Sequence, residues 1–267
     1  MACKWKLPFI LLSSLLLVSS CQKSSSTYEI GIDPSWYPMQ LDGQERNVLA
    51  FSIELLSTIG KQEKLPLAIA TVSWDNLIWG LRGKKTAAIL SSMRPYNFHL
   101  KEFSFSPRYL KSGPVIVAPF KSKIFGLRKL ANKEIGIVTG SNAQLLLQPV
   151  PGLIIHNFPS IPIALKKLYL GEVEAAVVGI LIAQKYIRNL YRKELKIASL
   201  PLDDEGLRLI TLKDAHPALM KKFKRGLTKL KKKGVYEKLL IKWGLSPDGD
   251  PPPDLEEKIE QLLQTVL

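Results

Sequence analysis

Hydrophobic and polar positions follow one another along the chain in a pattern that predicts an α/β protein. Short apolar runs, typical of buried strands, are separated by segments in which apolar residues recur at helical spacing. In one such helix Asp75 is the expected N-cap, and Trp79 is expected to pack inward. Strands are expected at 28–33, 66–71, 86–91, 113–118, 134–138, 153–158, 174–178, 196–200 and 207–212. Helices are expected at 48–61, 75–82, 142–147, 160–170, 180–190, 216–232 and 234–242.

Polar turns follow two of the predicted strands. Small hydroxyls and backbone amides at the carboxyl ends of buried strands are typical of ligand sites in α/β sheets. The second of these turns also precedes a predicted helix, so its amides suit a carboxylate or another anion. The alternative is a plain turn with a helix cap. The turns contain Ser91, Ser92 and Arg94 after one strand, and Gly140, Ser141 and Asn142 after the other.

The amino end predicts a lipoprotein signal peptide over residues 1–20. Two lysines precede an apolar run at 7–18, which is too short to span a bilayer as a mature helix. Small residues then precede Cys21, which is the expected site of lipid attachment, and 21–27 would be a flexible tether to a membrane of the cell envelope. The alternative is an ordinary signal peptide or a short anchor with Cys21 unmodified. The expected location is the periplasm, with the protein anchored by lipid.

Cysteine content and charge narrow the classes of function. A mature chain that begins at Cys21 keeps no other cysteine, which excludes a disulfide and thiol chemistry.

The formal net charge is +15, and the positive charge is densest over 221–233. Leu219, Phe223 and Leu227 form an apolar stripe along this stretch, which predicts a helix that packs on the protein. The basic residues are then the solvated face of that helix. Nucleic acid is therefore not an expected partner, and a basic surface beside anionic lipid is a weaker alternative.

Several segments in a fixed order resemble the family 3 periplasmic solute-binding proteins, the polar amino acid binders of ABC importers. The clearest stretch runs from Val72 to Tyr109, and the resemblance extends over about 28–246. The other segments read YEIGIDPSWYPM, NVLAFSIELL, EIGIVTGSNAQ, ALKKLYLGEVEAAVVG and KKKGVYEKLLIKWG.

The resemblance implies a two-lobed α/β fold with a ligand cleft between the lobes. One lobe would contain 28–112 and 207–246, and the other 113–206. Two crossovers, near 111–113 and 205–206, would form a hinge that closes on a solute. The implied partners are a small solute and the permease of an ABC importer, and no cofactor or metal is expected.

Comparison with the family by position implies a set of residues that face the cleft. Trp36 and Trp74 would stack on the ligand, although core packing is the alternative for both. The implied set is Asp33, Trp36, Trp74, Ser91, Ser92, Arg94 and His99 from one lobe, and Gly140, Ser141, Asn142 and Gly179 from the other.

Two departures from the family pattern affect the expected ligand. His99 stands where the family has an arginine for the α-carboxylate, and Gly179 stands where it has an aspartate for the α-ammonium. Arg94 could supply the missing guanidinium, or it is a surface arginine. The acids at 203–205 are the nearest candidates for the missing carboxylate. We therefore expect weak binding of free glutamine, arginine or histidine, and better binding of an acylated amino acid, an organic anion or a short peptide. An amino acid or a derivative still ranks first as the ligand, because the resemblance implies it and Arg94 could provide one anchor.

An enzyme is not expected. The three histidines are scattered, and no nucleophile motif or histidine pair at metal spacing is present. A sensing or interaction lipoprotein that has altered or lost amino acid binding is the alternative function.

The carboxyl end is expected to be a separate element. A Pro-rich break at 247–253 precedes a helix in which Asp254 and Glu257 have the spacing of a capping box. The apolar face of this helix needs a partner surface, which could be the protein's own body, a second copy or another envelope protein. That face contains Leu255, Ile259, Leu262, Leu263 and Val266.

Overall fold

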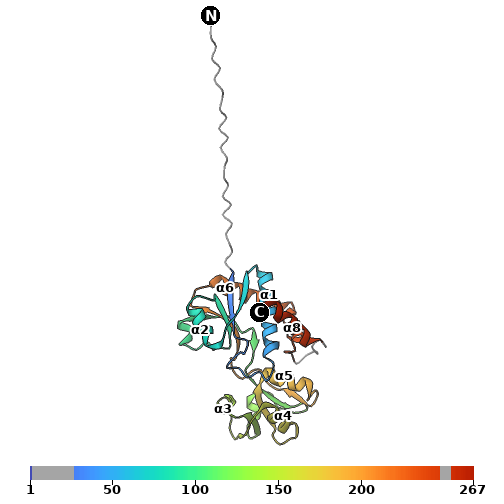
Figure 1. The fold of residues 1–267 in the computed structure, drawn as a ribbon. Helices are drawn as coiled ribbons and strands as arrows, with labels where there is room; N and C mark the ends of the chain where they lie inside the picture. Colours follow the sequence, from blue (N-terminus) through green and yellow to red (C-terminus); the bar gives the residue numbers. More distant parts are fainter. Residues whose placement is uncertain (2–26, 247–253) are drawn as a thin grey trace.

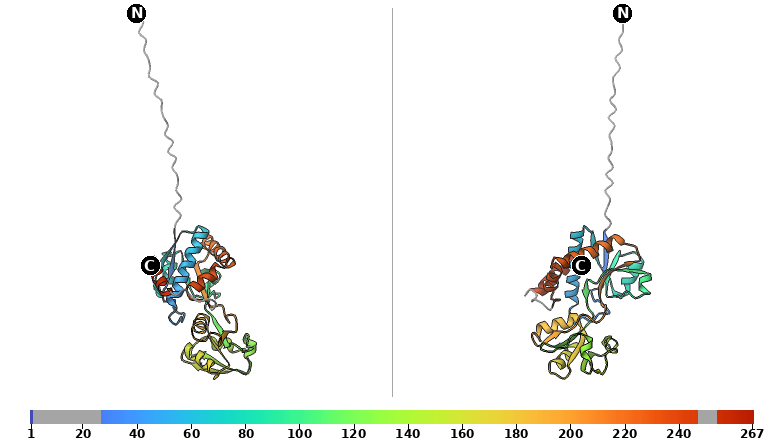
Figure 2. Two further views of the ribbon diagram at one scale, coloured as in Figure 1. Left: turned by 90° about the vertical axis from the view of Figure 1, so that its right-hand side faces the viewer. Right: turned by 180° about the vertical axis from the view of Figure 1, so that it is seen from behind.

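The computed structural model describes Met1 and residues 27–246 and 254–267. These residues form two α/β lobes, each built around its own sheet, which confirms the expected fold class (Figures 1 and 2). The predicted signal peptide, Cys21 and the Pro-rich break lie outside the described residues. Among the helices of the described segments, none has the length and apolar character of a membrane span.

The first lobe contains a six-stranded sheet in the order β2-β1-β3-β11-β4, with β5 paired to β11. β1, β2 and β3 are parallel, and β11 runs antiparallel to β3. The strands are β1 (Tyr28–Ile32), β2 (Leu67–Thr71), β3 (Ala88–Ser91), β4 (Phe103–Phe105), β5 (Leu110–Lys111) and β11 (Gly206–Leu212). The helices are α1 (Glu45–Glu63), α2 (Trp74–Arg82), α6 (Pro217–Lys232), α7 (Val235–Lys242) and α8 (Leu255–Val266), and a 3-10 turn covers His99–Lys101.

Two apolar clusters hold these helices on the first sheet. The larger cluster joins the sheet to α1, α6, α7 and α8, with Phe51, Phe223 and Trp243 among its buried side chains. A smaller cluster joins α2 to the sheet through Leu77 and Leu81. Burial of these apolar side chains is the main favourable term for the lobe.

The second lobe contains a five-stranded sheet in the order β10-β6-β9-β7-β8. Apolar clusters on both faces pack its helices against it. The strands are β6 (Pro114–Pro119), β7 (Glu134–Val138), β8 (Ile154–Phe158), β9 (Ala175–Gly179) and β10 (Leu195–Ile197). The helices are α3 (Ala143–Leu147), α4 (Ile161–Tyr169) and α5 (Ile180–Asn189), and a 3-10 turn covers Leu127–Leu130.

The chain passes between the lobes twice, after β5 and before β11. Glycines stand at both crossovers because neighbouring atoms leave no room for a side chain. A Cβ on Gly113 would collide with the Asp203 side chain, and one on Gly206, whose φ is +156°, would collide with the Leu110 carbonyl. Beside the crossovers, the Gln44 amide donates to the Leu181 carbonyl oxygen at 2.9 Å, which ties the start of α1 to α5.

Several local expectations are wrong. The short strands β4 and β5 were not expected, and α2 begins at Trp74 after Ser73, so that Asp75 lies in the first turn. Trp79 is 68% exposed instead of packed inward. The expected capping box of α8 is not formed, because the Asp254 carboxylate accepts a hydrogen bond from the Lys258 ammonium at 2.7 Å and makes no cap hydrogen bond.

The apolar face of α8 lies against the protein's own first lobe. Ile259 is fully buried, and its apolar neighbours on the helix pack against the large core cluster. An ion pair between Arg46 of α1 and Glu260 of α8 flanks this contact. Figure 1 shows α8 beside α1. The partner surface of α8 in this structure is therefore the protein's own body, which is one of the three that the sequence allowed.

Candidate functional site

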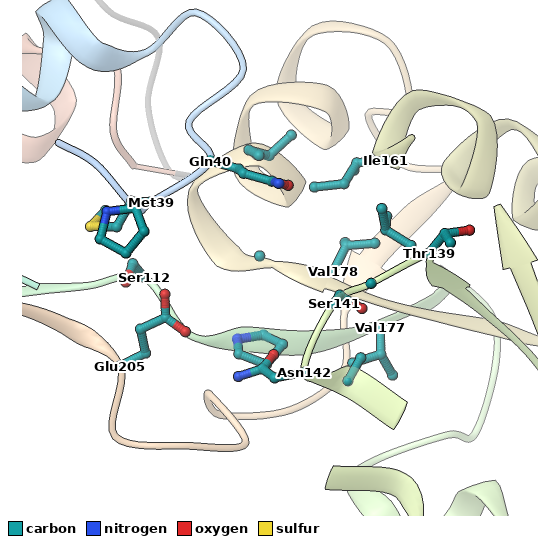
Figure 3. A pocket seen from close by; sticks show the side chains of 17 residues that line it. Met39, Gln40, Ser112, Thr139, Ser141, Asn142, Ile161, Val177, Val178 and Glu205 are labelled. Carbon is teal, nitrogen blue, oxygen red and sulfur yellow. The ribbon is translucent and has the colours of Figure 1, made fainter. Parts of the chain in front are cut away.

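A cavity of about 250 Å³ lies where the two lobes meet. Its walls come from the loop at 38–40 of the first lobe, from both crossovers and from the second lobe. Ser112 and Glu205 are the crossover residues, and the second lobe adds the β7–α3 loop and the end of β9. Figure 3 shows Gln40 and Ile161 at one end of the cavity, and Glu205 and Asn142 at the other. The cavity is therefore placed to respond to any movement of one lobe against the other.

Two hydroxyls of this cavity lack a hydrogen-bond partner in the described part of the chain. The Ser112 Oγ and the Ser141 Oγ are buried, and neither has a hydrogen-bond partner among the described residues. Buried hydroxyls are normally paired, because an unpaired one costs about 1–3 kcal/mol. Gly140 beside Ser141 has φ +76° and nothing within 4 Å of its Cβ position, so the loop presents open backbone to the cavity. These groups can hydrogen-bond a polar solute.

Charged side chains connect the cavity to the hinge. The Arg94 guanidinium, which follows β3, donates to Asp203 at 2.7 Å and to Glu205 at 2.9 Å. The Asn142 amide of the second lobe also donates to Asp203, at 3.0 Å. Partial burial lowers the pKa of Arg94, but the two carboxylates outweigh that effect and hold its pKa above the ordinary value. Arg94, Asp203 and Asn142 thus form a continuous polar link between the lobes.

The predicted residues of the second lobe come together in the cavity. Gly140, Ser141, Asn142 and Gly179 all line it. Gly179 has φ −57°, and a Cβ there would lie 3.7 Å from the Ser112 carbonyl oxygen, which is ordinary contact. The position can therefore accept a side chain without backbone strain.

Two predicted residues of the first lobe lie in its interior, away from this cavity. The Asp33 carboxylate accepts hydrogen bonds from the Ser35 amide at 3.0 Å and the Ser35 hydroxyl at 2.8 Å, and so stabilises its own turn. Trp36 is 3% exposed within the large core cluster, and its indole N–H donates to the Glu45 carbonyl oxygen at 3.1 Å. Trp36 thus follows the core-packing alternative in this conformation.

The remaining predicted residues of the first lobe also lie outside the cavity walls. Trp74 is half-buried, and its ring meets that of Tyr37 edge to face at 5.3 Å. The Ser91 hydroxyl accepts a hydrogen bond from the Met93 amide at 3.1 Å, and the neighbouring Ser92 is half-buried. The His99 Nδ1 lies 2.6 Å from the Arg94 carbonyl oxygen, so His99 supports the turn that carries Arg94.

Met39, Gln40 and Ser112 line the cavity although the sequence did not indicate them, and the acids at 203–205 were expected only as candidates for the missing carboxylate. Glu205 lines the cavity, and Asp203 shares the Arg94 guanidinium with it. The signal was present in the predicted hinge, because residues beside a hinge between two lobes also border the cleft. Within the described parts of the chain, no group of three or more His, Cys, Asp or Glu side chains could hold a metal ion.

Known proteins with similar sequences bind amino acids for ABC transporters. The chain is 24% identical to the arginine-binding extracellular protein ArtP of Bacillus subtilis, over 90% of this chain and 97% of that protein. It is 23% identical to the ABC transporter arginine-binding protein 1 of Escherichia coli, over 87% and 98%. These relatives are binding proteins and not enzymes.

A solved structure shares the fold. The L-cystine solute receptor of Neisseria gonorrhoeae, in its unliganded open conformation, aligns with a TM-score of 0.67 and 18% identity, over 84% of this chain and 95% of that one. The sequence profile of the bacterial extracellular solute-binding proteins, family 3, matches residues 28–246. The chain, a binding protein and not an enzyme, therefore belongs to the family 3 extracellular solute-binding proteins.

Proposed function

We propose that this protein captures an amino acid, an amino acid derivative or a short peptide between its lobes and delivers it to the permease of an ABC importer. The observation that carries the proposal is the cavity at the crossovers, whose walls come from both lobes and include two unpartnered hydroxyls and the Glu205 carboxylate. The amino acid binding of the relatives named above supports it.

Glu205 changes the ligand expected from the sequence: a solute with a cationic group that faces this carboxylate fits the cavity better than an organic anion does. A buried ammonium without a carboxylate costs several kcal/mol, and Gly179 offers none at the end of β9. Glu205 supplies a carboxylate from the crossover instead. The Ser141 hydroxyl and the neighbouring backbone suit a solute carboxylate. Free amino acids thus remain candidates, although the family's ammonium position is empty.

Capture proceeds by hinge closure about the two crossovers. The proposed lobes are 28–112 with 207–246, and 113–206. Asp203 accepts hydrogen bonds from Arg94 of one lobe and Asn142 of the other, so a solute that contacts Asn142 or Glu205 changes the contacts at the hinge itself. A ligand shifts the equilibrium between the open and closed arrangements only if it binds one of them more tightly than the other.

A screen of amino acids, derivatives and short peptides by tryptophan fluorescence, followed by small-angle scattering, tests the capture mechanism. The expected result is a saturable signal and a smaller radius of gyration with the bound solute. Saturable binding with an unchanged radius of gyration would contradict hinge closure. Absence of binding by every compound would contradict solute capture and would favour the sensing or interaction lipoprotein.

The proposed location is the outer face of a membrane, with the protein held by lipid on Cys21. Cys21→Ala should abolish labelling by a lipid precursor and release the processed protein from the membrane fraction. Ser25→Ala, which keeps Cys21 and the small residues before it, is the matched control. Unchanged membrane association of processed Cys21→Ala protein would contradict the anchor.

A further inference from the structure

One edge of the first sheet lies on the far side of the lobe from the crossovers. The amino ends of the parallel strands meet there, because Tyr28 is paired with Leu67 and Ile30 with Ala88. β11 begins beside the crossover at Gly206 and ends at Leu212, opposite Phe103, at this same edge. The second lobe, which contains α3 and α4, lies at the other end of the molecule (Figures 1 and 2).

Exposed lysines gather on the loops of this edge and on the start of α6. The Lys222 ammonium reaches the Lys64 carbonyl oxygen at 3.5 Å, and the rings of Tyr28 and His216 are 5.6 Å apart, so the loops and the helix lie together. Lys84, Lys85 and Tyr28 also border one surface hollow. We call the six exposed lysines of this region the basic edge: Lys61, Lys64, Lys84, Lys85, Lys213 and Lys221.

The basic edge carries little opposing charge. Its exposed carboxylates are Glu29 and Asp214. Two further acids nearby are already paired, Glu63 with Arg225 and Lys229 of α6, and Glu102 with Arg82 of α2. Across the described residues, none of the six lysines forms an ion pair. An unpaired cluster of this kind attracts an anionic partner.

The position of Cys21 in the sequence selects a membrane as that partner. β1 begins at Tyr28, which borders the same hollow as Lys84 and Lys85 of the basic edge. Cys21 lies seven residues earlier, and seven residues span at most about 25 Å whatever path they take. A lipid on Cys21 therefore holds this edge close to the bilayer, while attraction between lysines and anionic headgroups acts over a Debye length of about 8 Å at physiological salt.

We propose that the basic edge rests on the anionic phospholipid surface of the membrane that holds the lipid anchor. The inference rests on the proposed lipidation of Cys21 but not on the identity of the solute. Contact through this edge turns the crossovers and the second lobe away from the bilayer, so delivery of solute to a permease requires release of this contact. The protein then has a preferred orientation on the membrane instead of free rotation about its anchor.

Fluorescence energy transfer in vesicles tests the orientation. The lipidated full chain is extracted from membranes in two labelled forms. One carries the dye on Ala215→Cys at the basic edge, and the other carries it on Gln148→Cys in the second lobe. Both positions are exposed. Each form is reconstituted into neutral phosphatidylcholine vesicles or into vesicles with about a third phosphatidylglycerol, each with acceptor dye on headgroups. Mass spectrometry of the same preparation verifies the lipid on Cys21.

The expected result is transfer from Ala215→Cys that is about twofold higher in anionic than in neutral vesicles, and that falls to the neutral level at about 0.5 M salt. Transfer from Gln148→Cys should stay low in both. The variant Lys84→Glu/Lys85→Glu/Lys213→Glu/Lys221→Glu should lose the anionic enhancement. The matched control Lys121→Glu/Lys123→Glu/Lys129→Glu/Lys166→Glu makes the same charge change on exposed lysines of the second lobe and should retain it.

Three results would overturn the proposal. Equal transfer from Ala215→Cys in neutral and anionic vesicles would mean that headgroup charge does not orient the protein. Equal loss in both charge-reversal variants would mean that net charge, and not this edge, is responsible. A mass spectrum without lipid on Cys21 would remove the anchor on which the geometry depends. Solute binding measured on the same variants is expected to be unchanged, so failure of this proposal is distinguishable from failure of solute capture.

Discussion

Arg94 connects Glu205, which lines the cavity, with Asp203 at the crossover. Its guanidinium faces both Asp203 and Glu205, so neither carboxylate can change partner without affecting the other. A solute cation that approaches Glu205 competes with Arg94 for that carboxylate. In the proposed capture, an Arg94 guanidinium that loses Glu205 would keep its contact with Asp203.

Gly179→Asp tests the empty ammonium position. The change should strengthen binding of a solute with a free ammonium by about tenfold, or ~1.4 kcal/mol, because it places a carboxylate where the cavity has none. The backbone accepts it, since φ is −57° and the new Cβ has only ordinary contact. Calorimetric titration measures the effect.

Gly179→Asn is the matched control for that prediction, because it has the same shape without the charge. An anionic solute should bind more weakly to the Asp variant, through like-charge repulsion. Equal affinities of the Asp and Asn variants would show that this position does not face a charged group of the solute.

Glu63 gives the first lobe a predictable acid sensitivity. Hydrogen bonds from Arg225 and then Lys229 lower the pKa of Glu63 from 4.5 to about 2. Because the folded pKa lies below the unfolded one, the stabilisation is complete above about pH 4.5 and is lost as the pH falls towards 2. Glu63→Gln should therefore lower the free energy of unfolding at pH 7 and differ little from the wild type near pH 2.

Urea unfolding at several pH values measures this difference. Glu194→Gln, on an exposed loop of the second lobe, is the control and should change little. A Glu63→Gln deficit that is the same at pH 7 and pH 2 would contradict the ion-pair account.

At the scale of elements, periodicity predicts the long helices and most strands, because their apolar spacing is a local signal. β4 and β5 were missed because they have three and two residues and are defined by pairing with the distant β11. The exposure of Trp79 was missed for a related reason. Leu77 and Leu81 already cover the inner face of α2, and the Arg82 guanidinium lies 5.7 Å from the Trp79 ring centre.

The packing of α8 predicts a stabilising role. An isolated helix of this length is marginal in water, so its order depends on burial of Ile259 against the core. Ile259→Ala should lower the free energy of unfolding by about 2 kcal/mol or more. Gln261→Ala, on the exposed face of the same helix, should have little effect and serves as the control.

Truncation after Ser246 extends that test to the whole element. We expect a lower midpoint of thermal unfolding and an unchanged monomer-to-oligomer distribution in analytical ultracentrifugation. Loss of a dimer on truncation would contradict docking on the protein's own body, and an unchanged midpoint would contradict a stabilising role.

At the scale of the molecule, the two-lobed architecture was predictable, but half of the candidate site was not. The order of the motifs and the crossover glycines can be recognised from short stretches of the sequence. The position of Glu205 depends on how two crossovers bring separate lobes together, and no local pattern encodes that distance. Trp36 was predicted from its place in the sequence to face the cleft, but core packing buries it. Residues of one continuous loop, such as Gly140, Ser141 and Asn142, were predicted together and stay together.

The most direct test of solute capture at the crossover cavity is calorimetric titration of the purified protein with a panel of amino acids and derivatives, repeated on Glu205→Gln. We expect saturable binding of a solute with a cationic group. Glu205→Gln should lower the affinity by about 30-fold or more, because truncating a charge pair costs about 2 kcal/mol or more. Glu194→Gln should bind as the wild type does. Equal affinities of the wild type and Glu205→Gln for the cationic solute would contradict solute capture beside Glu205.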